Sequence, residues 1–331
     1  MQNIATTLSK TVVVIGTGGT IAGTSTNPAD NVGYSAAQLG AAQLVAAIPA
    51  LAGMPIEVEQ LAQIDSKDMG FALWRALAER VAQQLSRPEV GGVVVTHGTD
   101  TLEETAYFLH RVLAPRKPVV LTAAMRPATA LLSDGPQNLL DAVRVAHMPG
   151  ATGVVVVLAG TVHGGLDVRK LHTYRLDAFG SGDAGPIAHI EEGRLRQHRP
   201  WPQGQGQALG LARLPVDVAA WPQVAVLMSH AGADGRLVNA LRTAGVRGIV
   251  VAGTGNGSLH QELRAALLGA QADGIRVLRS TRCPLGGVVE AGADAPTTLS
   301  RSGLPSAGSL TPVQARIELM LSLMPSPAPT P

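Results

Sequence analysis

Hydroxyl and carboxylate side chains stand in glycine-rich segments that directly follow short apolar runs. Gly16–Thr20 follows the run Thr11–Ile15, and Thr96–Asp100 follows Gly92–Val95. A later segment, Ala252–Ser258, combines glycines with threonine, asparagine and serine. In doubly wound sheets, ligands bind beyond the carboxyl ends of the strands. These three segments are therefore the first candidates for a functional site.

The first segment does not match the phosphate-binding loops that its glycines suggest. A dinucleotide fingerprint starting at Gly16 needs a third small residue at position 21, where the chain has Ile21. A P-loop needs lysine after its last glycine, whereas Gly23 is followed by Thr24. The segment is more typical of a loop that holds the Thr20 hydroxyl at a strand end, and a turn or cap role for this threonine is the alternative.

The second segment offers a hydroxyl and a carboxylate at the start of an expected helix. Thr99 and Asp100 precede Leu102–Leu113, and free backbone N–H groups are expected at this helix start. Thr101 and Glu104 have the spacing of a capping box. A capping role for Asp100 itself remains the alternative to a catalytic one.

Short β-branched runs alternate with segments of helical periodicity, which is typical of a parallel sheet covered by helices on both faces. The expected strands are Thr11–Ile15, Gly92–Val95, Pro118–Leu121, Val154–Leu158, Val224–Met228, Gly248–Ala252 and Ile275–Leu278. The expected helices are Ala36–Ile48, Met69–Leu85, Leu102–Leu113, Pro136–Ala146, Arg236–Ala244, Leu259–Gln271 and Thr311–Leu323. We expect an α/β fold with two domains, a larger N-terminal doubly wound, mainly parallel sheet and a smaller C-terminal flavodoxin-like domain.

Length and composition agree with two domains. The chain has 331 residues, and a stretch rich in Pro, Gly, Gln and Arg interrupts its periodicity after Glu191. We predict an N-terminal domain over 1–195, a linker over 196–222, a C-terminal domain over 223–324 and a disordered tail over 325–331.

Charge and aromatic content exclude several classes of function. A net charge of +2 gives no strong attraction for nucleic acid or acidic membranes, and 3% aromatic residues leave little for base stacking. The apolar runs are strand-sized, and Met1–Lys10 lacks the apolar core of an export signal. We expect a cytoplasmic protein, or a periplasmic one if a leader has been removed.

Metal and thiol chemistry are not expected. The single cysteine, Cys283, has no partner for a disulfide or a metal site. The histidines show no metal-binding spacing, and His97 is expected to be a packing residue. The prediction is an enzyme without metal or other cofactor.

Two of these segments together resemble the paired signatures of the bacterial L-asparaginase family. They are Thr17–Gly23 and Thr96–Ala106. The resemblance is strongest to the type II branch, which includes the glutaminase-asparaginases. It continues in order along the chain through Ala124–Pro127, Ser133–Pro136, Asp167–Lys170, Gly185–Pro186 and Ala252–Ser258.

The resemblance implies hydrolysis of the side-chain amide of L-asparagine through an acyl-enzyme. By position, Thr20 matches the nucleophile, and Tyr34 matches a tyrosine on a mobile loop that assists it. Thr99, Asp100 and Lys170 match a second group in which the lysine serves the threonine as a base. Such chemistry needs an activated hydroxyl, a proton relay and an oxyanion hole.

Substrate binding also transfers by position. Ser66 matches the residue that holds the α-carboxylate, Asp100 the one that pairs with the α-ammonium, and Ala124 a backbone carbonyl near the substrate amide. Lys67 stands where many relatives have glutamine, so it either contacts the substrate or faces solvent.

The C-terminal domain is expected to complete the site of a neighbouring subunit. Ser258 stands where the best-known members place asparagine, and Asn256 in the same loop is also expected to bind substrate. The family's acidic residue from this domain falls near Glu290 or Asp294.

The implied partners are L-asparagine and L-aspartate, with L-glutamine as a second substrate. The implied assembly is a homotetramer made of intimate dimers, without nucleic acid or membrane. A glutaminase-asparaginase of balanced preference and a non-catalytic amino-acid-binding module are the alternatives.

Overall fold

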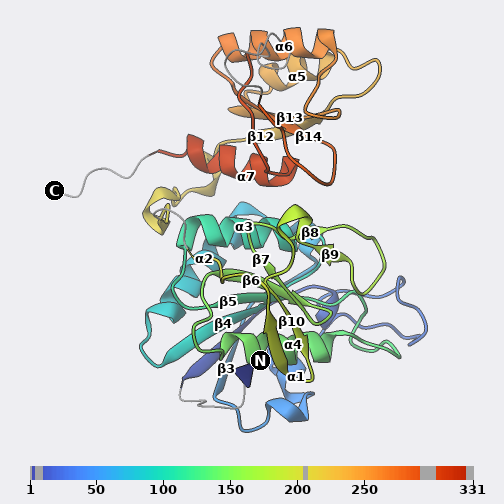
Figure 1. Cartoon of the computed structure of the whole chain (residues 1–331), viewed down its shortest axis with the longest axis vertical. Helices are drawn as coiled ribbons and strands as arrows, with labels where there is room; N and C mark the ends of the chain where they lie inside the picture. The colour runs from blue at the N-terminus through green and yellow to red at the C-terminus, as the bar shows by residue number, and fades with distance from the viewer. Residues whose placement is uncertain (1, 4–9, 204–207, 291–302, 326–331) are drawn as a thin grey trace, which may run out of the picture. The chain divides into compact units, whose positions relative to one another are not determined.

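The described part of the N-terminal unit contains a nine-stranded sheet, whose central strands are apolar runs rich in valine (Figure 1). The computed structural model describes residues 2–3, 10–203, 208–290 and 303–325. The strands are β1 (Gln2–Asn3), β2 (Thr11–Gly18), β3 (Ile56–Ile64), β4 (Val90–Thr96), β5 (Val119–Thr122), β6 (Val154–Leu158), β7 (Thr161–Gly164), β10 (Ala188–Glu191) and β11 (Arg194–Gln197). A separate ribbon pairs β8 (Arg169–Lys170) with β9 (Phe179–Gly180).

One half of this sheet is parallel and carries the candidate loops. Its strand order is β3-β2-β4-β5-β6, and all neighbouring pairs run parallel. The central strands are buried on both faces, which explains their continuous β-branched runs. Thr96 and Thr122 are partners at the carboxyl ends of β4 and β5. Loops that leave these strands therefore start at one edge.

The other half of the sheet is antiparallel, and its strands were not among the predicted ones. A tight turn at Ala159 and Gly160, both with positive φ, reverses the chain between β6 and β7. The strands β10, β11 and β1 continue the antiparallel order. The predicted α/β class is confirmed, and the sheet is mixed.

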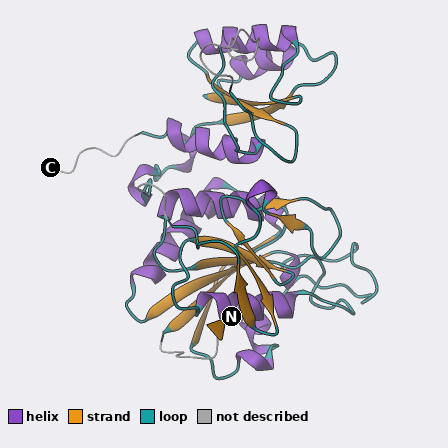
Figure 2. Cartoon of the chain, viewed as in Figure 1, coloured by secondary structure: helices purple, strands orange, loops and turns teal. Residues whose placement is uncertain are grey.

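Helices cover both faces of the parallel half (Figures 1 and 2). They are α1 (Ala41–Ala46), α2 (Phe71–Ser86), α3 (Leu102–Leu113) and α4 (Gly135–Ala146). Leu44 of α1 and Val143 of α4 pack with Val12 and Val120 in one core, whereas α2 and α3 pack against each other on β4 and β6.

The C-terminal unit is a smaller three-layer α/β structure. Its parallel sheet has the order β12 (Val224–Met228), β13 (Gly248–Gly253), β14 (Arg276–Thr281). The helices are α5 (Arg236–Thr243), α6 (Gln261–Ala272) and α7 (Pro312–Leu323). Apolar residues of α5 and α6 pack against Ile249, Val251 and Val277, and α7 packs against all three strands.

The boundary between the units falls between Leu211 and Ala212, within the predicted linker. The linker's first residues, Arg196 and Gln197, lie in β11, and Leu209 and Gly210 donate hydrogen bonds to carbonyls of α3. Residues 326–331 of the predicted tail lie outside the described residues. None of the described helices is long and apolar enough to cross a membrane.

Candidate active site

Two glycines bring the loops after β2 and β4 into direct contact. Gly19 has a φ of +85°, which favours glycine, and a methyl group there would collide with the main chain of Gly98. A methyl group on Gly98 would in turn collide with Ser66. The absence of side chains at these two positions lets the loops carrying Thr20 and Thr99 lie against each other.

The Thr20 hydroxyl is bonded to a tyrosine from the next loop. Thr20 starts a short 3₁₀ turn and is 7% exposed, and its Oγ1 lies 2.6 Å from the Tyr34 hydroxyl. Paired backbone hydrogen bonds between Thr24 and Ser35 close the loop that contains Tyr34. Either hydroxyl can be the donor in this bond.

A second hydroxyl is bonded to a lysine. Lys170 Nζ donates to Thr99 Oγ1 at 2.8 Å and forms an ion pair with Asp100 Oδ1 at 2.7 Å. The backbone N–H of Lys170 donates to Glu103 Oε2 at 2.5 Å. Burial raises the pKa of Glu103, and this hydrogen bond opposes the shift. Glu103 was not predicted as a site residue, although its position in the first turn of α3, one turn after Thr99, could have indicated it.

Ser66 links the α3 start to the loop after β3. Its Oγ accepts from the Asp100 backbone N–H at 3.1 Å, and its carbonyl accepts from the Thr101 hydroxyl at 2.8 Å. The predicted capping box at Thr101 is therefore wrong, because this side chain bonds Ser66 and does not cap the helix. Lys67 points elsewhere: its side chain is 60% exposed and pairs with Asp68.

The segment around Ala124 is held by two polar side chains of the α4 start. The Asp134 carboxylate accepts from the backbone N–H groups of Met125 and Arg126, each at 3.0 Å. Asn138 donates to the Asp134 carboxylate at 3.1 Å and to the Ala123 carbonyl at 2.9 Å. Burial raises the pKa of Asp134, and these hydrogen bonds oppose the rise. Neither residue was predicted to support the site, because the sequence marks Asp134 only as part of a helix start.

His97 supports the second loop from beneath. It is fully buried, its Nδ1 lies 2.7 Å from the Gly98 carbonyl, and its Nε2 lies 3.0 Å from the Thr105 hydroxyl. Trp74 donates to the same hydroxyl at 2.9 Å. Burial lowers the pKa of His97 to about 4, so the ring is neutral at pH 7.

In the C-terminal unit, the predicted residues lie on one loop and the segment bonded to it. The Asn256 amide exchanges two hydrogen bonds with the Val289 backbone, at 2.9 and 2.7 Å. The buried Arg279 donates to the Asn256 carbonyl at 3.2 Å and to Glu290 at 3.1 Å. Ser258 is exposed, and its hydroxyl has no hydrogen bond to any described residue.

The remaining predicted residues add no metal chemistry. Asp294 lies outside the described residues. Within the part of the chain that the structure describes, no three His, Cys, Asp or Glu side chains could hold a metal ion together. Cys283 is an exposed free thiol. The arrangement is one of hydroxyls, a lysine and backbone groups.

Both units match models of the same enzyme family. Residues 11–203 match the family described as "Asparaginase, N-terminal", and residues 223–328 match "Glutaminase/Asparaginase C-terminal domain". The protein belongs to the asparaginase family, and the resemblance seen in the sequence is confirmed.

The similar proteins are named either L-asparaginase or glutaminase-asparaginase. The chain is 36% identical to L-asparaginase 2 of Escherichia coli (strain K12), over 94% of this chain and 88% of the relative. It is 35% identical to the glutaminase-asparaginase of Pseudomonas fluorescens biotype A, over 94% and 86%. The crystal structure of a probable cytoplasmic L-asparaginase from Campylobacter jejuni matches with a TM-score of 0.87 and 35% identity, covering 95% of each chain.

Proposed function

We propose that the protein hydrolyses the side-chain amide of L-asparagine to L-aspartate and ammonia, with L-glutamine as a secondary substrate. One observation carries this proposal: two threonine hydroxyls at one sheet edge each have their own proton-handling partner. Thr20 is bonded to Tyr34, and Thr99 is bonded to Lys170. Relatives named for asparaginase and for glutaminase-asparaginase activity support both substrates.

The reaction proceeds in two steps. Thr20 Oγ1 attacks the amide carbon and forms an ester, the C–N bond breaks, and the nitrogen leaves as ammonia after taking a proton. The Tyr34 hydroxyl accepts the threonine proton and passes it on to the leaving group. Backbone N–H groups of the contacting loops stabilise the oxyanion. Water then cleaves the ester and releases aspartate.

Lys170, Thr99 and Asp100 form a second group that moves protons during the reaction. Lys170 is the proposed base for Thr99, since its Nζ lies 2.8 Å from Thr99 Oγ1, and Asp100 Oδ1, at 2.7 Å, holds the Nζ beside this hydroxyl. Glu103 holds the backbone of Lys170 and is a positioning residue.

Substrate contacts come from three loops of this unit and one loop of a neighbouring subunit. Ser66 holds the α-carboxylate, Asp100 pairs with the α-ammonium, and the Ala124 carbonyl accepts from the amide. Ser258 and the Asn256 loop approach from the neighbour in a homotetramer of intimate dimers. Of the two roles expected for Lys67, its exposed side chain and its ion pair with Asp68 favour the solvent-facing one.

The test measures ammonia release from asparagine and from glutamine at sub-millimolar concentration. Thr20→Ala is expected to abolish release while the melting temperature stays unchanged. Thr173→Ala is the matched control, because Thr173 is exposed and lies outside the candidate site. Turnover retained in Thr20→Ala would reject the nucleophile, and binding of asparagine without turnover in the native protein would reject the enzyme.

A balanced preference is the second candidate function, and the exposed Ser258 hydroxyl favours it. Equal kcat/KM for the two amides in the same assay would establish it.

The tetramer is tested by light scattering of the native protein. A cytoplasmic location, which suits the free thiol of Cys283, is tested by cell fractionation.

A further inference from the structure

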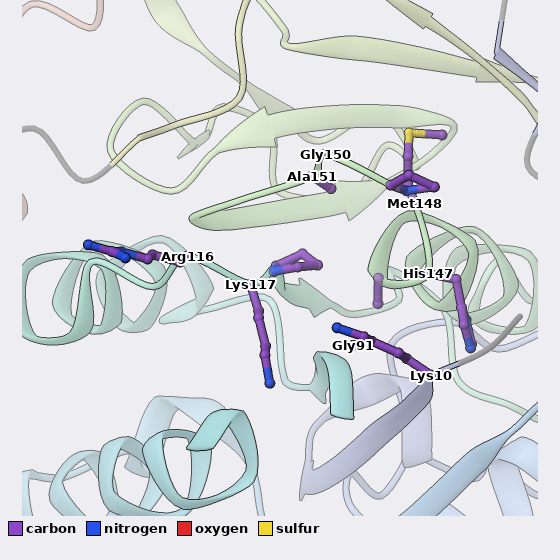
Figure 3. Close-up of a pocket in the computed structure, with 11 residues that line it drawn as sticks. Lys10, Gly91, Arg116, Lys117, His147, Met148, Gly150 and Ala151 are labelled. Carbon is purple, nitrogen blue, oxygen red and sulfur yellow. The ribbon is translucent and has the colours of Figure 1, made fainter. Parts of the chain in front are cut away.

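A cavity at the opposite edge of the parallel sheet is lined by basic side chains (Figure 3). It has a volume of about 300 Å³ and lies at the amino ends of β4 and β5, next to Gly91 and Pro118. The candidate active site lies at the carboxyl ends of the same strands. The cavity is therefore separate from that site, and a ligand bound in it would be independent of the proposed amide hydrolysis.

Cations line this cavity without any carboxylate. Lys10, Arg116 and Lys117 line it together with His147, whose pKa is lowered by burial, and no aspartate or glutamate is among the lining residues. Lys10 and Lys117 extend toward the same space in Figure 3. In the described part of the chain, neither lysine nor Arg116 forms an ion pair.

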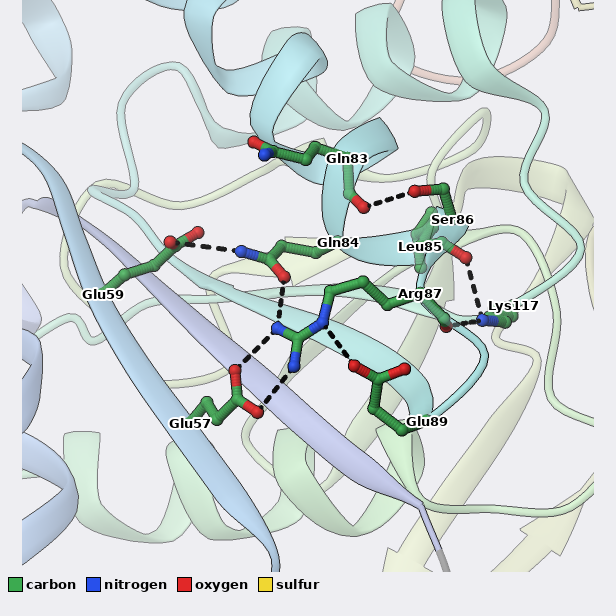
Figure 4. Close-up of polar contacts among 9 residues, drawn as sticks. All are labelled: Glu57, Glu59, Gln83, Gln84, Leu85, Ser86, Arg87, Glu89 and Lys117. Carbon is green, nitrogen blue, oxygen red and sulfur yellow. Dashed lines mark hydrogen bonds and ion pairs between the residues drawn. The ribbon is translucent and has the colours of Figure 1, made fainter.

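The nearby carboxylates of Glu57 and Glu89 form ion pairs with Arg87, which does not line the cavity (Figure 4). Arg87 binds Glu57 through two hydrogen bonds, at 2.7 and 2.8 Å, and Glu89 through one at 2.8 Å. Glu89 acts on Lys117 only at longer range. Both carboxylates therefore have their direct contacts with Arg87, and neither forms an ion pair with a cation of the cavity.

Helix ends offset part of the positive charge. Lys117 donates to the carbonyls of Leu85 and Arg87 at the end of α2, at 2.8 and 2.7 Å, and His147 follows the end of α4. Each helix end carries about half a negative charge. Two ends offset about one of the three positive charges, so a net positive charge remains.

Burial and a neighbouring charge both act on Lys117. Burial and the nearby charge of Lys10 lower the pKa of Lys117. Two of its three N–H groups are used by carbonyls, which leaves one for a ligand. Met148 and Pro149 add an apolar wall. An anion between the two lysines would relieve the repulsion.

We propose that this cavity binds a phosphate group, either as the free ion or carried by a small organic molecule. A phosphate monoester has a charge of about −1.5 to −2 at pH 7 and three acceptor oxygens, which fits the unpaired cations. The volume is at the lower end of the range for small-molecule pockets, about 300–1,000 Å³. The apolar wall suits the carbon part of a monoester.

Isothermal titration of the full-length protein with inorganic phosphate tests the proposal, with acetate at equal ionic strength as the reference anion. We expect one saturable site per chain for phosphate and none for acetate. A titration with phenyl phosphate distinguishes the two sources, because tighter binding than inorganic phosphate identifies the organic monoester.

The decisive variant is Lys10→Gln with Arg116→Gln, because both side chains are exposed and neither forms a hydrogen bond to a described residue that the change would break. We expect its Kd for phosphate to rise about tenfold or more, equivalent to about 1.4 kcal/mol. Arg247→Gln with Arg276→Gln removes the same charge from exposed positions of the C-terminal unit and should change Kd by less than about twofold.

Two results would overturn the proposal. One is the absence of saturable phosphate binding up to about 20 mM, which corresponds to a binding free energy weaker than about −2.3 kcal/mol. The other is an equal loss of binding in both double variants, which would show only a response to net charge.

Discussion

The strand-end loops of the two units use their polar side chains differently. In the N-terminal unit, side chains distant in sequence bond to each other, as Thr20 does to Tyr34 and Lys170 to Thr99. In the C-terminal unit, Asn256 bonds the backbone of its neighbouring segment, at Val289. The first pattern keeps hydroxyls next to proton carriers, and the second makes a rigid loop.

From this difference we expect substitutions in the two units to affect different properties, namely the rate in one and stability in the other. Conservative changes in the N-terminal loops should alter the rate far more than stability, because each removes a single hydroxyl hydrogen bond, which contributes about 0.5–1.5 kcal/mol to folding. Changes at the base of the C-terminal loop should alter stability more than rate. The largest effects are therefore expected at the hydroxyl pairs.

Thr99→Val should lower kcat for asparagine by about 10³-fold, because it removes the hydroxyl bonded to Lys170. Lys170→Met should have a similar effect, and Thr99→Ser should retain most activity. Steady-state kinetics and the melting temperature are the measurements. A large fall in melting temperature for Thr99→Val would contradict the expected difference between the units.

Acid should destabilise the N-terminal unit through its buried histidines, which include His97, His110 and His163. The pKa of His97 is about 4 when folded and 6.5 when exposed, so the unfolded chain binds more protons between these values. Stability is then lost as pH falls from 6.5 towards about 4, by about 3 kcal/mol for this residue.

Urea unfolding at a series of pH values measures this loss. His97→Gln removes one titrating ring and should lower the slope in this interval by its share, because His110 and His163, whose pKa values burial also lowers to about 4, still titrate. His172→Gln is the control, because His172 is exposed. An unchanged slope in His97→Gln would show that His97 does not cause the acid sensitivity.

Arg279→Met should destabilise the C-terminal unit by about 2 kcal/mol, because it removes charged hydrogen bonds from a buried side chain. Glu290 is half exposed, so its ion pair adds little. Arg276→Met, on the same strand and exposed, is the matched control. A loss of asparagine turnover as large as that of Thr99→Val would remove the distinction between the units.

Ser258→Asn should have the smallest effect, a shift of a few-fold in the ratio of kcat/KM towards asparagine. The exposed hydroxyl has room for a larger amide that can bond a substrate. The two amides are compared in one assay. An unchanged ratio would place selectivity in the N-terminal loops.

Helices with a clear hydrophobic period and strands with a continuous apolar run could be predicted from the sequence. Strands at the edge of the nine-stranded sheet could not. The helix Leu102–Leu113 and the strand Val224–Met228 have the predicted bounds. The strand Ile56–Ile64 was missed, because it alternates Glu57 and Glu59 with apolar residues and is buried on neither face completely. A continuous apolar run, the sign of a strand buried on both faces, is absent from such a segment.

The sequence predicted the site residues that have reactive groups of their own. It did not predict the residues that hold those groups in position. Thr20 and Thr99 stand out beside glycines at strand ends. Glu103, Asp134 and Asn138 were missed because their role depends on tertiary contacts with Lys170 and the Ala124 segment. The helix predicted from Ala36 starts later, at Ala41, because the preceding backbone bonds the Thr20 turn.

The contact between Gly19 and Gly98 has a consequence for engineering this enzyme. The Gly98 main chain lies where a Cβ of Gly19 would be, and the Ser66 side chain lies where a Cβ of Gly98 would be, so the contact has no room for a larger side chain. A library aimed at new amide substrates should therefore also keep Ser66, because its side chain lies against Gly98 and its hydroxyl accepts from the Asp100 backbone. Positions 19 and 98 should stay fixed in such a library.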